Sequence, residues 1–431
     1  MTPTLELDGA RPLAIISVHS CPFAEIGGGE NGGMSVYLRE VARALAARGL
    51  RSHIFTRRDD PGAPPHLDLP DGCHVVHIDA GPPKPLAKDD VFYHLPEFLH
   101  GVTEYAREEG VEFQLVHSHY WLSGWVGRRL GGLWGVPWLH TSHTLARVKD
   151  RDRPPGASPA ARHRVAVEDE IVRDCNRLVS PTAQEVEDLA QLYGVERGCA
   201  AIVAPGVDPG TFAWRDPAPV RQALGIAEDA PVLLAVGRLE RLKGMDTAIH
   251  ALADLRGRGV AAELVVVGDD SGSGRAEAGG HRTEKARLLA VARDLEVDDV
   301  THFAGSVAHD RLPEYYSLAD VCVVPSYSES FGLVAIEAQA CGTPVVASRV
   351  GGLRQLVIDG ITGYTVARHD PHLYANAIAA ILEDPERRAS MSAAARQLAR
   401  NYSWARTADR LVDVYAETID SYDRAAEAVF A

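Results

Sequence analysis

The stretch "PLAIISVHSCPFAEIGGGENGGMSVYLREVARALAARG", residues 12–49, joins two different hydrophobic patterns through a loop rich in glycine. Its first part, "PLAIISVH", is a short apolar run with β-branched residues, which predicts a buried strand. In its last part, "MSVYLREVARALAARG", Val36, Val41 and Leu45 fall on one face of a helix. Gly49 then provides a good helix stop. The stretch therefore predicts a strand followed by a helix.

This alternation continues along the chain. Further strands are predicted at "RSHIFTR", "HVVHIDA", "FQLVHSH", "PWLHTSH" and "RLVSPT", and helices at "LPEFLHGVTEYAREEG" and "HRVAVEDEIVRDC". Strands that alternate with helices form a parallel sheet that is covered on both faces. The Pro/Gly-rich stretch "APGVDPGTFAWRDPAP", residues 204–219, then predicts a linker.

A second series follows the linker, with strands at "PVLLAVGR", "AELVVVG", "VTHFAG", "VCVVPS" and "PVVASR". We therefore expect an α/β protein of two doubly wound, Rossmann-like domains, residues 1–207 and 208–404, with a cleft between them. A last helix, residues 405–431, is long enough to cross back onto the first domain. Ligands of such sheets bind at the carboxyl ends of strands, which places the site in the cleft. The loops "AGPPKPLAKDD" and "VKDRDRPPGASP" would border it.

The composition narrows the class of partner. The 431 residues include 59 acidic and 44 basic side chains, a net charge of −15, so we expect small-molecule substrates and no nucleic acid. The six cysteines form no CxxC pair, and the N-terminus does not resemble a signal peptide. No apolar stretch approaches the ~20 residues of a membrane span. We expect a cytoplasmic protein without membrane insertion, and leave open whether it forms a homodimer.

The glycine-rich loop could bind an anion. Gly27, Gly28, Gly29, Gly32 and Gly33 permit close backbone approach, and the helix that follows offers free N–H groups and its positive dipole end. This combination fits a diphosphate. The loop is not the GxGxxG of dinucleotide-binding proteins, and a plain tight turn stays an alternative.

A second anion site is predicted at "VGRLERLKG". Arg238 and Lys243 lie just past the first strand of the second domain, where two cations could clamp a diphosphate from the opposite wall of the cleft. A solvated charged loop is the alternative interpretation.

The segment "SESFGLVAIEAQACGTP" contains two carboxylates, Glu329 and Glu337, eight positions apart. Glu329 should lie in the loop after a strand, and the helix that starts near Phe331 should present N–H groups to a ligand. Glu337 should lie about two turns into that helix, facing the same cleft. Carboxylates bind sugar hydroxyls well, so the pair suits a nucleotide sugar. A helix cap and a buried salt bridge are the alternative.

The histidines of "HSHYW" and "HTSHT" and the acidic "DRD", Asp150 to Asp152, invite a metal interpretation. Each histidine pair ends a strand, and no Glu or Cys completes a zinc set. The "DRD" run lies in a charged, Pro-rich segment that predicts a solvated loop. We therefore expect no metal, and we assign His143 to polar ligand contacts. No GxSxG motif or Cys/His nucleophile is evident.

Taken together and in this order, the motifs resemble the GT-B glycosyltransferases of family 4. "ENGGMSVY", "PGVD", "GRLERLKG" and the two glutamates all match, over nearly the whole chain. "HSHYWLSG", "HTSHTLA" and "SWARTA" are similar to the mycothiol-pathway branch, which transfers N-acetylglucosamine from UDP to 1D-myo-inositol 3-phosphate. Sucrose-phosphate synthases are similar, though less so.

The resemblance implies roles for the donor site. The donor diphosphate would meet the Gly32–Gly33 turn, Arg238 and Lys243. Glu337 would bind the ribose, and His143 would contact the sugar near its 6-position. Glu329 would bind the transferred sugar together with the backbone N–H groups that follow it, those of Ser330, Phe331 and Gly332.

The resemblance also implies an acceptor-phosphate site made of Lys88, Tyr120, Thr144 and Arg164. One position departs from the mycothiol enzymes, in which the asparagine of "GGMNVY" contacts the inositol; here Ser35 takes that acceptor-binding position. A serine is shorter and lacks the amide's N–H donors. The acceptor is therefore inositol 3-phosphate; the alternative is a natural-product transferase of specialised metabolism that uses another nucleotide sugar and a different small acceptor, including a thiol. An idle nucleotide-sugar-binding protein is a third hypothesis.

The implied mechanism is front-side substitution with retention at the sugar carbon. Catalysis would come from positioning and charge stabilisation by Arg238, Lys243, Glu329 and His143, without a cofactor beyond the nucleotide-diphosphate sugar, such as UDP-GlcNAc.

Overall fold

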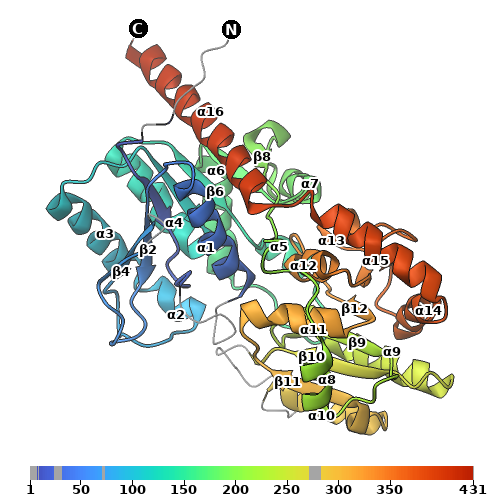
Figure 1. The fold of residues 1–431 in the computed structure, drawn as a ribbon. Helices are drawn as coiled ribbons and strands as arrows, with labels where there is room; N and C mark the ends of the chain where they lie inside the picture. Colours follow the sequence, from blue (N-terminus) through green and yellow to red (C-terminus); the bar gives the residue numbers. More distant parts are fainter. Residues whose placement is uncertain (1–6, 8, 24–31, 70–72, 271–282, 431) are drawn as a thin grey trace, which may run out of the picture.

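The structure is a computed structural model that describes residue 7 and residues 9–23, 32–69, 73–270 and 283–430. It contains two open sheets with helices on both faces (Figure 1). We call the part built on the first sheet the first domain and the part built on the second sheet the second domain. This two-domain α/β architecture confirms the predicted fold class, whereas the boundaries at residues 207 and 404 stay predictions.

The first sheet has the strand order β3-β4-β2-β1-β5-β6-β7-β8. Its strands are β1 (Leu13–Ile16), β2 (Ser52–Arg57), β3 (His66–Asp68), β4 (Cys73–Ile78), β5 (Leu115–His119), β6 (Trp138–Thr141), β7 (Arg177–Ser180) and β8 (Ala200–Ile202). Its helices are α1 (Gly33–Ala46), α2 (Lys88–Phe92), α3 (Leu95–Glu109), α4 (Tyr120–Trp134), α5 (Ala146–Arg151), α6 (Arg162–Asp174) and α7 (Ala183–Tyr193).

The second sheet has the order β11-β10-β9-β12-β13-β14. Its strands are β9 (Val232–Val236), β10 (Glu263–Val267), β11 (Thr301–Gly305), β12 (Val321–Val324), β13 (Val345–Ser348) and β14 (Gly363–Val366). Its helices are α8 (Ala218–Leu224), α9 (Met245–Gly257), α10 (Glu284–Asp294), α11 (Leu312–Leu318), α12 (Leu333–Cys341), α13 (Leu353–Leu356), α14 (Pro371–Leu382) and α15 (Pro385–Ala399).

Burial of both faces explains the continuous apolar runs of the strands. In β1, Leu13 and Ile15 join the core under α1, whereas Ala14 and Ile16 join the core under α3 and α4. Alternate residues point to opposite faces of a strand, so a strand covered on both sides has no polar face. The second sheet repeats this arrangement, with α11 and α12 on one face and α9 and α14 on the other.

Some short elements differ from the sequence-based prediction. β3 is an antiparallel edge strand, paired with β4, in a first sheet that was predicted to be parallel throughout. It has only three residues, two of them exposed, so it carries no hydrophobic signal. β8 and β14 are also edge strands of three and four residues that the prediction missed.

Helix α4 was likewise not predicted, because it contains glycines that are poor helix formers. A Cβ atom on Gly124 would collide with Ile171 of α6, and one on Gly127 with Trp138 of β6. These glycines let α4 pack unusually close to its neighbours, and that tertiary contact outweighs the low helix propensity.

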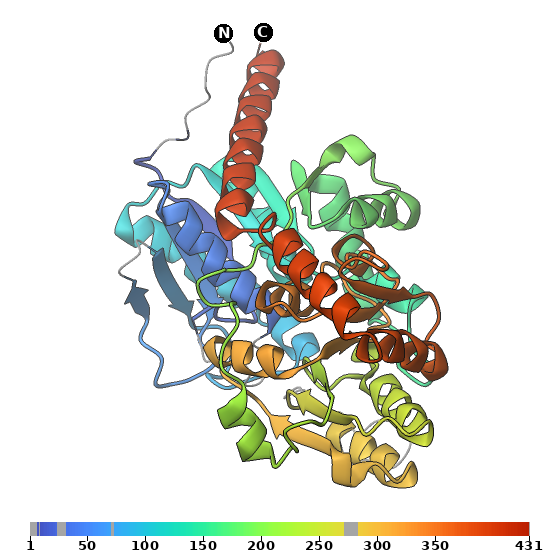
Figure 2. The ribbon, with the colours of Figure 1, turned by 45° about the vertical axis from the view of Figure 1, so that its right-hand side comes forward.

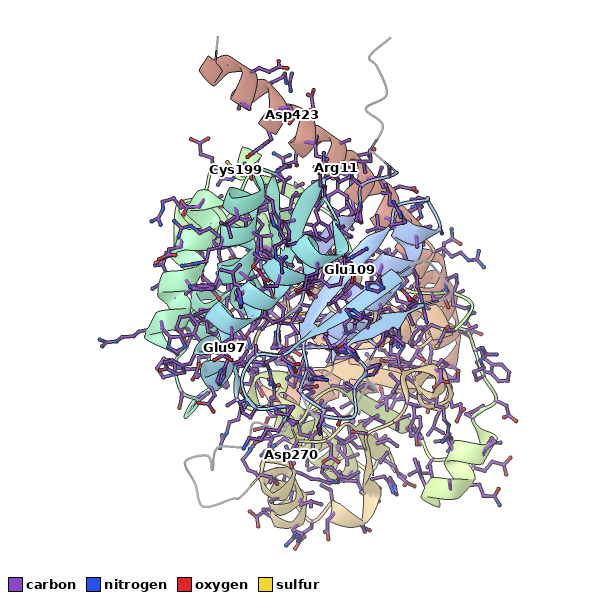
Figure 3. All side chains as sticks on the ribbon, turned by 90° about the vertical axis from the view of Figure 1, so that its left-hand side faces the viewer. Arg11, Glu97, Glu109, Cys199, Asp270 and Asp423 are labelled. Atoms are coloured by element: carbon purple, nitrogen blue, oxygen red, sulfur yellow. The ribbon has the colours of Figure 1, made fainter. Side chains whose placement is uncertain are left out.

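The last helix, α16 (Trp404–Phe430), crosses back onto the first domain as predicted (Figures 1 and 2). Leu411, Val414 and Tyr415 lie in the core that also contains the buried face of α1. The Tyr415 hydroxyl lies 2.8 Å from Nδ1 of the buried His117. The last turns, around Asp423, extend beyond the sheet (Figure 3).

The chain passes between the domains twice, and the two passages are bonded to each other. The Val207 N–H donates to the Tyr402 carbonyl at 3.1 Å, and the Thr407 hydroxyl donates to the Ala204 carbonyl at 2.8 Å. A Cβ atom on Gly206 would collide with the backbone of Trp404, so this position needs glycine. The linker and the start of α16 therefore form one seam. No described helix is both long and apolar enough to cross a bilayer.

We predict that the first domain loses stability steeply below pH 6.5. Burial lowers the pKa of His117 and of His143 to about 3, and holds the pKa of His119 and His140 well below the usual value. As the pH falls below 6.5, these histidines bind protons in the unfolded chain but stay neutral in the folded protein. The unfolding free energy therefore decreases until the pH reaches the pKa of the folded state. Each such histidine should lower the unfolding free energy by about 1 kcal/mol between pH 6.5 and 5.5.

The measurement is the urea midpoint, followed by tryptophan fluorescence, because four of the six tryptophans lie in this domain. The urea midpoint of the variant His140→Gln should depend less on pH than that of the wild type. Its midpoint at pH 8, where the histidines are neutral in both states, measures the loss of packing alone. A midpoint that stays constant from pH 7.5 to 5.5 would contradict the prediction.

Candidate active site

The candidate site lies where the carboxyl ends of both sheets meet. A cavity of about 100 Å³ is lined from the first domain by residues that include His143, Thr144 and Lys149. From the second domain it is lined by residues that include Arg238, Lys243, Glu329 and Ser330. The Ser330 hydroxyl donates to the His143 carbonyl at 2.5 Å, a direct bond between the domains.

Glu329 is paired with Lys243, whose Nζ lies 2.7 Å from Oε2 of the carboxylate. Two glycines position the loop that carries it. The Gly352 N–H donates to the Glu329 carbonyl at 3.1 Å, and Gly351 has a φ of +42° with no room for a Cβ atom against that same carbonyl. The loop that carries Glu329 follows β12 and is therefore positioned by two glycines that follow the next strand, β13.

Arg238 lies against the start of α1. A Cβ atom on Gly32 would be 3.5 Å from Arg238 Nε, and one on Gly33 would be 3.3 Å from Leu333, the first residue of α12. The structure thus brings Gly32, Gly33 and Arg238 together with the N-terminus of α12, which has no side-chain cap at Gly332. Gly27, Gly28 and Gly29 lie outside the described residues.

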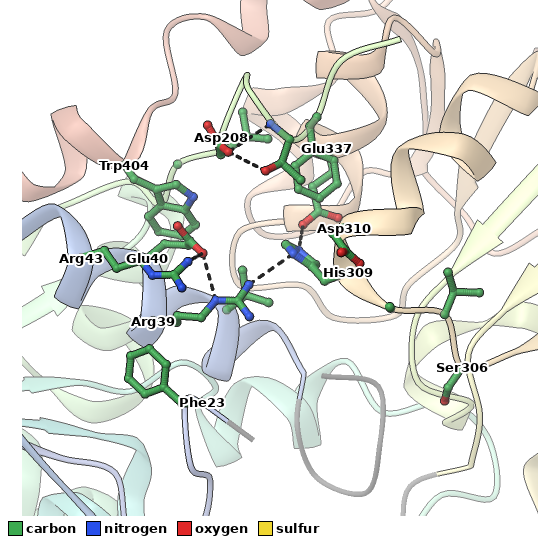
Figure 4. A pocket seen from close by; sticks show the side chains of 17 residues that line it. Phe23, Arg39, Glu40, Arg43, Asp208, Ser306, His309, Asp310, Glu337 and Trp404 are labelled. Carbon is green, nitrogen blue, oxygen red and sulfur yellow. Dashed lines mark hydrogen bonds and ion pairs between the residues drawn. The ribbon is translucent and has the colours of Figure 1, made fainter. Parts of the chain in front are cut away.

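Glu337 faces a different and larger cavity, of about 840 Å³ (Figure 4). It is the fifth residue of α12, so it lies just over one turn into the helix and not two turns as predicted. Its two oxygens accept from Tyr316 Oη at 2.8 Å and from His309 Nε2 at 3.1 Å. The two carboxylates of this segment therefore line separate cavities.

The four predicted acceptor residues converge in the first domain. Arg164 NH1 donates to Tyr120 Oη at 3.1 Å, and its NH2 donates to Thr144 Oγ1 at 3.2 Å. Lys88 Nζ lies 5.6 Å from the Tyr120 ring centre. Lys88 begins α2 and is not in the loop predicted at "AGPPKPLAKDD", whereas Arg164 lies in α6, the helix predicted at "HRVAVEDEIVRDC".

Electrostatics in this cluster favour an anion. Burial acts to raise the pKa of the Tyr120 hydroxyl, but Arg164, Lys88 and Lys149 outweigh it and lower the pKa. Lys149, on α5, is a further cation that the sequence interpretation missed. Burial lowers the pKa of its ammonium, in part opposed by Tyr120 and Glu240. In the sequence, the closeness of Lys149 to Thr144, five residues earlier, could have marked this lysine as part of the acceptor cluster.

His19 is a second residue that the sequence interpretation missed. It follows β1, and its ring lies 4.6 Å from that of Tyr120. Burial, with the charges of Lys88, His143, Arg238 and Arg164, holds its pKa well below the usual value, so the imidazole is neutral. Among the described residues its Nδ1 has no hydrogen-bond partner. A neutral imidazole nitrogen here can accept from a ligand hydroxyl.

Ser35 lies deeper than predicted for a ligand contact. It is fully buried in α1, and its hydroxyl lies 2.6 Å from that of Ser20. His143 is held in an unusual conformation, with φ of +56°, and its Nε2 lies 3.0 Å from Nδ1 of His119. Strained backbone of this kind is common at functional sites.

The "DRD" run is not a loop. Asp150 and Arg151 belong to α5, and Arg151 bonds to both Asp152, at 2.7 Å, and Asp188, at 2.6 Å. The Ala160 N–H donates to Asp150 at 2.8 Å. The local arginine and the approach to α7 stabilise a helix that the proline-rich sequence did not suggest. No three acidic, histidine or cysteine side chains in the described ranges are arranged to hold a metal.

Comparison with known proteins identifies the class. Residues 32–206 match the family model "Glycosyl transferase 4-like domain", and residues 218–398 match "Glycosyl transferases group 1". The chain is 44% identical to D-inositol 3-phosphate glycosyltransferase 2 of Catenulispora acidiphila, over 95% of this chain and 96% of that protein. It is 43% identical to the D-inositol 3-phosphate glycosyltransferase of Kineococcus radiotolerans, over 96% and 97%.

Solved structures agree with this result. Sucrose-phosphate synthase from Thermosynechococcus elongatus superposes with a TM-score of 0.85 at 33% identity, over 95% of this chain and all of that one. Anabaena HepE in complex with UDP and glucose superposes with a TM-score of 0.73 at 18% identity, over 94% and 99%, a likeness of fold.

Two parallel-sheet domains that meet at a cleft, with these matches over both, define a GT-B glycosyltransferase. The chain belongs to glycosyltransferase family 4, as its motifs predicted.

We predict that Gly351→Ala, at a glycine that lines the smaller cavity, strongly lowers turnover by displacing the loop that carries Glu329. The added methyl group collides with the Glu329 carbonyl and must displace the loop that carries Glu329. A displacement of about 1 Å at a reacting group can lower turnover roughly a hundredfold. The measurement is nucleotide release from the donor under saturating substrates.

Gly360→Ala is the matched control, because Gly360 also has a positive φ, +74°, but open space around its Cβ position. It should lose about 1–2 kcal/mol of stability from the left-handed conformation and keep its turnover. Equal turnover in both variants would refute the role given to Gly351.

Proposed function

We propose that the chain transfers a sugar, with retention, from a UDP-GlcNAc-like donor to inositol 3-phosphate. The observation that carries the proposal is the convergence of Lys88, Tyr120, Thr144 and Arg164 in one cluster beside the cleft that Arg238 lines. The name of the relatives, D-inositol 3-phosphate glycosyltransferase, at 43–44% identity over nearly the full length, supports the same acceptor.

The acceptor side suits a phosphate dianion. The cations Lys88, Lys149 and Arg164 surround the Tyr120 hydroxyl, and each group donates to oxygen. Glu168 accepts from Arg164 Nε at 2.7 Å and fixes the guanidinium plane, which leaves the other two nitrogens directed at Tyr120 and Thr144. An arginine oriented in this way is suited to bind phosphate through two parallel bonds.

The donor side suits a nucleotide diphosphate. Arg238 and Lys243 supply positive charge beside the uncapped N-terminus of α12, whose backbone N–H groups and dipole favour an anion. Glu337 lines the larger cavity, which has room for a nucleoside, and its carboxylate can accept from ribose hydroxyls.

In the proposed reaction the bond from the sugar's anomeric carbon to the diphosphate breaks, and an acceptor hydroxyl forms the new bond on the same face. Its proton passes to the leaving phosphate oxygen. Arg238 and Lys243 stabilise the charge that develops on that phosphate, which is the largest contribution such a site can make. Glu329 and His143 hold the sugar, and His19 accepts from an acceptor hydroxyl.

A specialised-metabolite transferase with a different small acceptor is the second candidate, favoured by Ser35 in place of the asparagine of the mycothiol branch. The full-length identity to the inositol phosphate enzymes favours the first.

The deciding experiment is a mass-spectrometric screen of UDP-, ADP- and GDP-sugars against acceptors that include inositol 3-phosphate, free inositol and small thiols, each with and without EDTA. Product from UDP-GlcNAc and inositol 3-phosphate, unaffected by EDTA, supports the proposal. Product only with an uncharged or thiol acceptor would replace it with the second candidate. No turnover of any nucleotide sugar would refute both.

We predict that Arg238→Ala lowers turnover by roughly two to three orders of magnitude, the usual loss for one strong electrostatic stabiliser. The donor KM should change less, because the charge on the phosphate is greatest in the transition state. Arg241→Gln, three positions later and outside the cavity lining, is the control. Near-normal turnover of Arg238→Ala would contradict the donor-clamp assignment.

We predict that Lys88→Ala raises the acceptor KM by about ten- to a hundredfold, since a hydrogen bond to a charged group is worth roughly 1.5–3 kcal/mol. The donor KM should hardly change, because Lys88 lies on the acceptor side of the cleft. Lys84→Ala, at an exposed position four residues earlier, is the matched control. Steady-state kinetics that show the donor KM rising instead would overturn this placement.

A further inference from the structure

Glu337 is a buried carboxylate whose orientation is fixed from two sides. Its side chain is 7% exposed, and it accepts from Tyr316 Oη at 2.8 Å through Oε2 and from His309 Nε2 at 3.1 Å through Oε1. Each carboxylate oxygen has two lone pairs, so one on each remains for a ligand. The plane of the carboxylate, and hence the direction of those lone pairs, is set by these two neighbours.

The state of His309 follows from its other contact. Arg39 NH2, on α1 of the first domain, lies 3.5 Å from His309 Nδ1 (Figure 4). A guanidinium has only N–H donors, so His309 Nδ1 must accept. The proton of the neutral imidazole is then on Nε2, from which it is donated to Glu337. The contact with Arg39 therefore favours the His309 tautomer whose Nε2–H donates to the Glu337 carboxylate.

Packing keeps this chain of contacts in place. Phe212, from the linker, meets the His309 ring edge-on at a centroid distance of 5.0 Å. Glu40 accepts from Arg39 Nε at 3.0 Å and turns the guanidinium toward His309. His309 lies in the 3₁₀ helix η4 (His309–Arg311) of the second domain and its side chain is 14% exposed, on the wall of the large cavity.

We propose that His309 is the positioning residue that orients Glu337 toward the vicinal diol of the donor's ribose, and that Arg39 sets His309 for this task from the other domain. The inference rests on the proposed function, because it needs a nucleotide donor with its ribose at Glu337. It adds a specificity determinant that spans the domains: the carboxylate is correctly oriented only while α1 and η4 lie side by side.

The test compares binding of UDP and 2′-deoxy-UDP by titration calorimetry, for the full-length wild type and its variants. Wild type should prefer UDP by about ten- to a hundredfold, the range for hydrogen bonds to a charged group. His309→Phe keeps the packing against Phe212 but loses both nitrogens, and its preference should fall below about threefold. A purely structural defect would instead weaken both ligands equally.

Two further variants sharpen the result. His309→Gln keeps one donor for Glu337 and one acceptor for Arg39, so it should recover most of the preference. Arg39→Leu should lower the preference toward that of His309→Phe, although residue 39 lies in the other domain. Arg311→Gln, in the same short helix but paired with Glu314 at the surface, is the control and should match wild type.

The outcomes separate the two levels of inference. A wild type that prefers UDP, with the preference intact in His309→Phe, overturns the role of His309 and leaves the proposed function standing. A loss in His309→Phe without any change in Arg39→Leu overturns the contribution of Arg39. A wild type that binds both ligands equally, or neither, overturns the ribose assignment of Glu337 and with it this inference.

Discussion

An unpaired charge is expensive to bury, and this constraint organises the whole cleft. Glu329 is neutralised by Lys243, Glu240 by Arg238 and Glu168 by Arg164. The two proposed donor-side cations and Arg164 are therefore each already paired with a carboxylate. The carboxylates hold the cations in place, in positions where a phosphate can share them. Glu337, inside the apolar helix α12, is satisfied differently, by hydrogen bonds from Tyr316 and His309.

The large elements could be predicted from the sequence because their signals are local. The strand runs of both domains and the amphipathic helices α1 and α3 have clear periodicities, and glycines mark their ends. What the sequence could not provide is the pairing of the carboxylates with their partners. Glu329 meets Lys243, 86 positions earlier, whereas Glu337 meets a histidine and a tyrosine.

The missed features have a common physical cause, which is that tertiary contacts decide them. Helix α4 contains glycines that local propensity would exclude, and their value appears only when α6 and β6 pack against it. Strands β3, β8 and β14 are too short to show a period. From the sequence alone, Lys149 is predicted as an ordinary loop lysine and His19 as a strand-end histidine; only the fold places them beside Tyr120. The proposed acceptor residues, by contrast, were predicted only through resemblance, because four separate segments supply them.

The seam between the linker and the start of α16 has a mechanical consequence. A single covalent passage would let the domains swivel in any direction, whereas two passages bonded side by side through Val207–Tyr402 and Thr407–Ala204 leave rotation about one line as the easy motion. The seam then acts as the hinge axis between the two domains. Ser330 and His143 lie on opposite sides of the cleft, so each rotation about this axis separates them along nearly the same arc.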